Sequence, residues 1–130
     1  MDEHESLLRK MYAAIEAGGD VSPFFHPEAE QIEYPSVMRP HGHRRPLAEI
    51  LGGAEQGRRA IASQSYEVRT VLLDGERAAV QLTWQATTAV ELGDLAAGTA
   101  LTAHVGAFYE FKDGLVLQQS SYDCYEPLHG

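Results

Sequence analysis

Asp123 is the residue whose surroundings in the sequence point most directly to chemistry. The strand register favoured below places four residues on its sheet face: Ala103, Val105, Tyr66 and Trp84. Burial among such side chains raises the pKa of a carboxyl group, which can then act as a general base, or as a general acid if its pKa approaches neutrality. The alternative is a carboxylate at a strand end that pairs with an arginine or caps a helix. The sequence leaves both interpretations open.

A wider set of polar and aromatic side chains could converge in one apolar cavity. Its hydrogen-bonding members are Tyr12, Tyr34, Tyr109, Gln119, Ser121 and Asp123. Its walls would come from Trp84, Tyr66, Val105, Ala107, Phe24 and Phe25. A few convergent polar groups in a mostly hydrophobic pocket orient a small molecule, and aromatic walls suit a ring system. Any single aromatic residue is more simply explained by core packing, so only the whole set predicts a ligand site.

The histidines at positions 41 and 43 are the other groups that could do chemistry. They flank Gly42 in a loop that also carries Arg39, Arg44 and Arg45. Imidazole binds metals and transfers protons near neutral pH, but the sequence offers no obvious third or fourth ligand, so we predict no metal site. The arginines could steer an anionic substrate toward the cavity or form surface ion pairs with nearby acids, and we favour the ion pairs.

Length, composition and charge set limits on the kind of protein. The 130 residues, 44% of them hydrophobic, suffice for a single domain spanning residues 1–130 with one core. A formal net charge of -9 argues against nucleic acid and anionic membrane surfaces as partners. One cysteine excludes an intrachain disulfide. The acidic N-terminus is unlike a signal peptide and no apolar run reaches membrane-spanning length, so we expect a cytoplasmic protein.

Hydrophobic periodicity predicts helices first and strands later. Apolar residues at helical spacing indicate a helix over residues 6–17, and a short helical turn over 21–25 begins with Ser22 as its N-cap. Residues 28–34 alternate as a strand, and residues 35–45 form a loop. Pro46 then opens a second helix with an apolar face that reaches Ile61, although Gly52 and Gly53 weaken it.

Two hairpins follow, because the apolar period changes to two from Ser65 onward. Three-residue loops at 73–75 and 112–114 would pair Tyr66 with Leu82 in the first hairpin and Val105 with Ser121 in the second. This register turns Gln119, Ser121 and Asp123 inward and buries Leu115 and Leu117. A two-residue second turn would instead turn Gln118, Ser120, Tyr122 and Cys124 inward, because a slip of one residue flips every side chain.

The chain resembles the nuclear transport factor 2-like superfamily, particularly its SnoaL-like branch related to polyketide cyclases. Three stretches carry the resemblance: LRKMYAAIEAGGD, FHPEAEQIEYP and FKDGLVLQQSSYDCYEP. It implies an α+β fold, a cystatin-like α+β roll in which a curved antiparallel sheet wraps around helices to form a cone-shaped pocket. It also implies a homodimer formed through the outer sheet surface, where Thr102, His104, Phe108 and Tyr122 would lie.

The catalytic residues of the family transfer only in part. By its position, Tyr12 resembles the first-helix tyrosine of the ketosteroid isomerases, but Tyr34 and Ala107 stand where those enzymes carry aspartates. Ala107 and Ser121 stand where the polyketide cyclases carry a histidine and an aspartate. Neither known mechanism is therefore complete here.

Three functions remain open after this comparison. One is a cofactor-free cyclase or isomerase in which Asp123 moves a proton and Tyr12 or Tyr34 stabilises an enolate. Another is a non-catalytic module that binds or carries an apolar cyclic metabolite. The third is a structural dimerisation domain with a solid interior.

Overall fold

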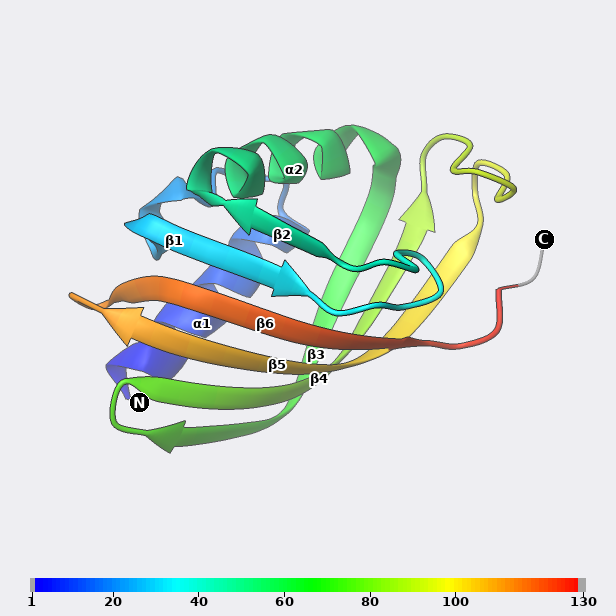
Figure 1. Ribbon diagram of the computed structural model, residues 1–130. Coiled ribbons are helices and arrows are strands. Elements are labelled where there is room, and N and C mark those ends of the chain that lie inside the picture. Colours follow the sequence, from blue (N-terminus) through cyan, green and yellow to red (C-terminus); the bar gives the residue numbers. More distant parts are fainter. Residues whose placement is uncertain (1, 129–130) are drawn as a thin grey trace.

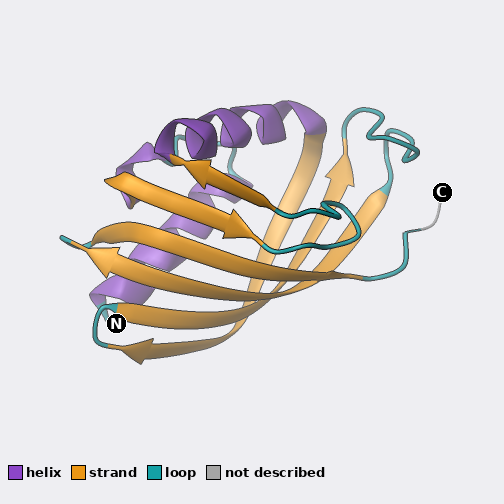
Figure 2. Cartoon of the chain, viewed as in Figure 1, coloured by secondary structure: helices purple, strands orange, loops and turns teal. Residues whose placement is uncertain are grey.

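Two α-helices, one short 3-10 helix and six strands make up residues 2–128, the part of the chain that the computed structural model describes (Figures 1 and 2). In chain order they are α1 (Glu3–Glu16), η1 (Ser22–Phe24), β1 (Phe25–Glu33), β2 (His43–Pro46), α2 (Leu47–Ala60), β3 (Ile61–Asp74), β4 (Arg77–Thr88), β5 (Ala100–Lys112) and β6 (Leu115–Tyr125).

One six-stranded sheet curves around the helices without closing into a barrel (Figure 1). The strand order is β2-β1-β6-β5-β4-β3. Neighbouring strands run antiparallel except β1 and β6, which are parallel. Helix α1 packs against β3 on the concave side, and α2 packs against β1, β2 and the start of β3. This is the α+β roll expected from the sequence.

Helix α1 begins three residues earlier than the predicted residue 6. The Asp2 carboxylate accepts hydrogen bonds from the backbone N–H groups of His4 (2.7 Å) and Glu5 (3.4 Å), which stabilises the first turn. The helix buries Leu8 and ends before Gly18, whose φ of 68° suits a helix stop.

The region after α1 differs from the prediction in two ways. Ser22 is the first residue of η1 rather than its N-cap, and its N–H donates to the Asp20 carboxylate (2.9 Å). The predicted loop over residues 35–45 contains the start of β2, which pairs with β1 so that Ile32 lies opposite Arg44. The predicted helix that follows Pro46 is confirmed as α2, with Ile50 buried.

Both hairpin turns have two residues, whereas we predicted three. In the second, Asp113 and Gly114 both have positive φ (54° and 74°), as a type I′ turn requires. That turn alone would have sent the polar residues of β6 outward. A β-bulge at Leu117 adds one residue and restores the predicted face, so Gln119 and Asp123 point inward.

The strand partners consequently lie two residues from those predicted. Tyr109 lies opposite Gln119, and Val105 lies opposite Asp123. In the first hairpin a bulge at Arg69 has the same effect. The predicted burial of Leu115 and Leu117 was wrong, because both are partly exposed and Val116 between them is fully buried.

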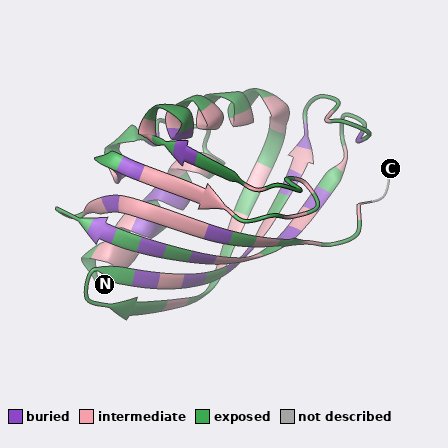
Figure 3. Ribbon diagram, in the orientation of Figure 1, coloured by how far each residue is buried: buried purple, intermediate pink, exposed green. Residues whose placement is uncertain are grey.

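The core lies between α1 and the inner face of the sheet. Along the strands, buried and exposed residues alternate because successive side chains point to opposite faces of the sheet (Figure 3). Its most deeply buried large side chains are Leu8, Met11, Tyr109 and Val116. The predicted inward set on β5 is confirmed: Leu101, Ala103, Ala107, Tyr109 and Phe111 are buried and Val105 is partly buried.

Candidate functional site

A cavity of about 1610 Å³ lies between the two helices and the inner face of the sheet. Long inward-facing side chains at one end of the sheet fill the core, whereas smaller ones farther along β5 leave space. Val105, Ala107 and Tyr109, successive inward-facing residues of β5, line this space. The cavity counts against a purely structural domain, for which we predicted a solid interior.

Aromatic rings form much of the cavity wall. The Tyr12 and Tyr66 rings stack with centroids 5.0 Å apart, and the Trp84 ring meets the Tyr125 ring edge-on at 6.3 Å. The indole N–H of Trp84 donates to the side-chain oxygen of Gln64 (2.9 Å), which fixes the ring. Such walls offer flat, polarisable contact area to a ring-shaped ligand.

Asp123 lines this cavity from β6, as predicted. Its partial burial is the main cause that raises the pKa of the carboxyl above its ordinary value of 3.8, and the nearby charge of Glu33 raises it further. A hydrogen bond from Ser121 and the charge of Arg45 act in the opposite direction. A carboxyl in this environment holds a proton more tightly than a surface aspartate and is a stronger base once ionised.

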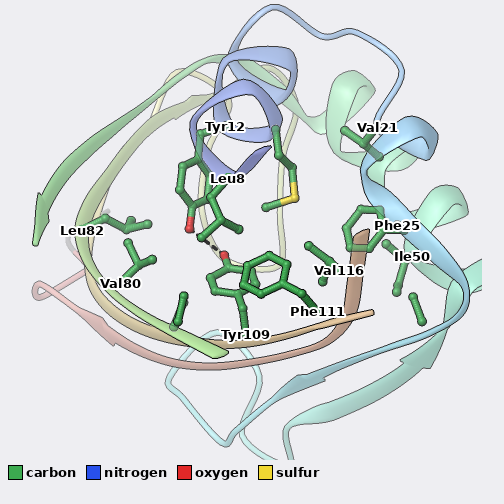
Figure 4. Close-up of a cluster of buried hydrophobic side chains, with 14 residues drawn as sticks. Leu8, Tyr12, Val21, Phe25, Ile50, Val80, Leu82, Tyr109, Phe111 and Val116 are labelled. Carbon is green, nitrogen blue, oxygen red and sulfur yellow. Dashed lines mark hydrogen bonds between the residues drawn. The ribbon is translucent and has the colours of Figure 1, made fainter. Parts of the chain in front are cut away.

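Two tyrosine hydroxyls form the second polar feature of the cavity. The hydroxyl oxygens of Tyr12 and Tyr109 lie 2.6 Å apart, one from α1 and one from β5 (Figure 4). Burial raises the pKa of Tyr12 to about 12 and that of Tyr109 well above its ordinary value. Both hydroxyls are therefore neutral at physiological pH and act as hydrogen-bond donors rather than bases.

A chain of side-chain hydrogen bonds continues from these tyrosines along the cavity wall. The amide nitrogen of Gln119 donates to the Tyr109 oxygen (3.1 Å), and that of Gln31 donates to the Gln119 oxygen (3.0 Å). The Arg45 guanidinium donates to Gln31 (2.9 Å) and to Glu33 (2.6 Å). This series of hydrogen bonds therefore joins a partly buried ion pair to the hydroxyl pair.

The structure brings most of the predicted site residues together. The cavity lining includes Tyr12, Tyr66, Trp84, Val105, Ala107, Tyr109, Gln119, Ser121 and Asp123. Tyr34 and Phe24 are absent from it. The Tyr34 ring is exposed and stacks on Tyr122 at 4.5 Å, and Phe24 packs against the core.

Tyr34 therefore leaves the candidate site. It follows the last residue of β1, where its N–H donates to the Ser121 carbonyl, and its ring turns to the outer surface of the sheet. A role for Tyr34 in stabilising an enolate was an expectation from strand alternation, and the position of its ring beside Tyr122 offers no support for it.

Several cavity residues were missed by the sequence analysis: Gln31, Glu33, Arg45, Gln64 and Tyr125. We treated Arg45 as one of several surface arginines, yet it is 8% exposed. The sequence held no signal for this burial, because Arg45 turns inward only through the pairing of β2 with β1.

The other two arginines of the 35–45 region form ion pairs, as favoured: Arg44 contacts Glu30 (2.8 Å) and Arg39 contacts Glu33 (3.9 Å). The His43 imidazole lies 3.5 Å from the Glu49 carboxylate. Within residues 2–128, no group of three or more histidine, cysteine, aspartate or glutamate side chains is arranged to hold a metal ion. No helix in this part of the chain is both long enough and apolar enough to cross a membrane.

Comparison with known proteins identifies the family. Residues 8–119 match the family model of the SnoaL-like domain, so the chain belongs to the SnoaL-like family. No curated protein sequence matches the chain.

Solved structures share the fold at low sequence identity. AclR of Streptomyces galilaeus, a candidate hydroxylase, is 19% identical with a TM-score of 0.77, and the match covers 93% of this chain and 74% of AclR. IdmH of Streptomyces antibioticus, a candidate polyketide cyclase, is 15% identical with a TM-score of 0.76, covering 94% and 92%. An NTF2-like protein of unknown function from Burkholderia pseudomallei is 18% identical with a TM-score of 0.76, covering 95% and 92%. At these identities the likeness extends to the fold alone.

Proposed function

We propose that this protein binds a small, largely apolar cyclic or aromatic molecule in its cavity and carries out cofactor-free acid–base chemistry on it through Asp123. The observation that carries the proposal is the placement of a partly desolvated carboxyl and a neutral hydroxyl pair in one aromatic-lined cavity. Relatives named as polyketide cyclases or as an isomerase support this class of chemistry.

The chemistry follows from the two polar features. Asp123, as carboxylate, removes a proton from a carbon next to a ligand carbonyl, and the electron pair of the broken C–H bond moves onto the carbonyl oxygen as an enolate. The hydroxyl of Tyr12 donates a hydrogen bond to that oxygen, where the negative charge develops. In an isomerisation, the protonated Asp123 returns its proton to another carbon of the conjugated enolate as the carbonyl re-forms. In a ring closure, the enolate carbon bonds to a second carbonyl carbon of the ligand, and Asp123 returns its proton to the alkoxide oxygen that results.

A non-catalytic binding or carrier module is the second candidate function. It is favoured by Ala107 and Ser121, which lie opposite each other on β5 and β6 within the cavity. These are the two positions where the family resemblance leads us to expect a histidine and an aspartate. A carrier needs only the apolar cavity and one or two polar anchors.

Binding in the cavity is tested by filling it. Replacing Val105 with tryptophan places an indole in the space opposite Asp123, and we expect it to weaken binding of α-tetralone, a bicyclic ketone, at least about tenfold. Titration calorimetry measures the affinity. The matched control is Phe108→Trp on the outward face of the same strand, which should leave binding unchanged. Equal affinity in all three proteins would place the ligand elsewhere.

We also propose that the protein assembles as a homodimer through the outer face of its sheet. Phe108 is 52% exposed and Tyr122 is 48% exposed, and their rings meet edge-on at 6.0 Å with Tyr34 stacked beside them. Contiguous exposed aromatic residues of this kind are typical of subunit contacts.

The dimer is tested by placing a charge in this patch. We expect the wild-type protein to sediment as a dimer and Phe108→Glu to sediment as a monomer at the same concentration, because two copies of an unpaired carboxylate would be buried. Leu72→Glu, at an exposed residue of β3, is the control that should remain dimeric. A wild-type monomer would remove the assembly proposal.

A further inference from the structure

The hydrogen-bond chain from Arg45 to Tyr12 has a direction that the chemistry of its members determines. A guanidinium can only donate hydrogen bonds, so the side-chain atom of Gln31 that faces Arg45 must be its oxygen. The Gln31 amide nitrogen therefore faces Gln119 and donates to its oxygen. The Gln119 nitrogen in turn faces Tyr109 and donates to its hydroxyl oxygen.

This direction reaches the pair of tyrosine hydroxyls. The Tyr109 oxygen accepts a hydrogen bond from Gln119. Because Tyr109 is buried, its own O–H needs an acceptor, and among the described residues that acceptor is the oxygen 2.6 Å away on Tyr12. Among the described residues, the Tyr12 hydroxyl has one hydrogen-bond partner, which is Tyr109. The proton of Tyr12 consequently has no acceptor within residues 2–128 and is available to the cavity that this residue lines.

We propose that Arg45, Gln31 and Gln119 are positioning residues that hold the Tyr12 O–H as a donor toward the ligand, so that the cavity selects ring molecules carrying a carbonyl or enolate oxygen at that point. This inference rests on the proposed function, since it specifies which part of the ligand Tyr12 meets. None of the three residues is required to touch the ligand; they act through Tyr109.

The burial of the residues in this hydrogen-bond chain supports a positioning role. Arg45 and Tyr109 are buried, and no buried side-chain nitrogen or oxygen in the described part of the chain lacks a hydrogen-bond partner. A fully satisfied buried network resists rearrangement, because reversing one amide would set two donors or two acceptors face to face. The ion pair of Arg45 with Glu33 holds the starting point of the chain in place.

At pH 8, Gln119→Glu reverses the direction of the hydrogen bond between residue 119 and Tyr109, with almost no change in the shape of the side chain. A carboxylate at this position still accepts from Gln31 but can only accept from Tyr109, so the Tyr109 oxygen must now accept the proton of Tyr12. Binding is measured with α-tetralone and with its analogue in which an exocyclic methylene replaces the carbonyl oxygen. We expect about tenfold weaker binding of the ketone and unchanged binding of the methylene analogue.

Two comparisons separate this role from general damage to the site. Gln118→Glu adds the same charge one residue away on the opposite face of β6 and should leave both affinities unchanged. In a Tyr12→Phe background, Gln119→Glu should cause no further loss of ketone affinity. The inference would be overturned if Gln119→Glu lowered the affinity for both ligands equally. It would also be overturned if Gln119→Glu lowered the ketone affinity as much in the Tyr12→Phe background as in the wild type.

A measurement without ligand tests the direction itself. The proton shared by the two hydroxyls couples through three bonds to the ring carbons of the tyrosine that carries it, which carbon-13 labelling of tyrosine reveals by NMR. We expect coupling to Tyr109 in the wild-type protein and to Tyr12 in Gln119→Glu, and coupling to Tyr12 in the wild type would refute the proposed direction. If neither ring ligand binds, the proposed function fails, while this measurement still decides the direction.

Discussion

Replacing Asp123 with asparagine is expected to slow the exchange of the α-protons of α-tetralone with solvent by about 100-fold or more, because a positioned general base contributes a factor of this order. Asparagine keeps the shape of the side chain but cannot accept the proton. The rate is measured by proton NMR in deuterated buffer, as loss of the signal from the carbon beside the carbonyl with catalytic amounts of protein.

The control for this prediction is Asp113→Asn in the turn between β5 and β6, where the carboxylate is exposed and outside the cavity. It should exchange α-protons at the wild-type rate. The affinity of Asp123→Asn for the ketone should also stay near that of the wild type, which separates lost chemistry from lost binding. Wild-type exchange in Asp123→Asn, or no protein-dependent exchange at all, would favour the carrier function.

Replacing Arg45 with methionine is expected to lower the free energy of unfolding by about 3 kcal/mol. Arg45 is 8% exposed and its guanidinium contacts both Glu33 and Gln31. Methionine keeps most of the aliphatic packing but leaves a partly buried carboxylate and an amide oxygen without their donor, and the nearby Arg39 can compensate only in part. Chemical denaturation measures the change.

The neighbouring arginine offers a matched control. Arg44→Met removes an ion pair of similar length, 2.8 Å to Glu30, but the side chains concerned are largely in solvent. We expect it to cost less than about 1 kcal/mol, as is usual for exposed pairs. Similar losses in the two variants would show that Arg45 is an ordinary surface residue and would weaken the positioning role inferred for it.

The sequence predicted the parts of this fold that depend on periodicity. The helical spacing of Leu8 and Met11 and the alternation of Ala103 to Phe111 identified the two surfaces that enclose the core, and both are confirmed. The inward position of Asp123 was also predicted correctly, although the turn and the bulge at Leu117 were both missed. The two errors cancelled because each changes the face of β6 by one residue.

What the sequence could not predict depends on contacts between distant segments. Arg45 is buried only because β2 pairs with β1 and brings it beside Glu33, and nothing in a loop rich in proline and arginine indicates that pairing. Tyr34 was placed in the cavity because Ile32 and Tyr34, the hydrophobic members of the alternation, were expected to face inward. In the structure Gln31 and Glu33 face the cavity instead, so alternation turns Ile32 and Tyr34 outward, where Tyr34 stacks on Tyr122.

Acid–base chemistry by Asp123 requires a partly desolvated carboxyl that faces the cavity, and the pKa of that carboxyl is the measurement that decides whether it is one. The side-chain carboxyl carbon is followed by NMR through a pH titration of the wild-type protein, with Asp123→Asn to assign the signal. We expect a pKa above the ordinary aspartate value of 3.8, because burial and the charge of Glu33 both oppose ionisation. A pKa at or below that value would mean a solvated or ion-paired carboxylate, and it would contradict acid–base catalysis by Asp123.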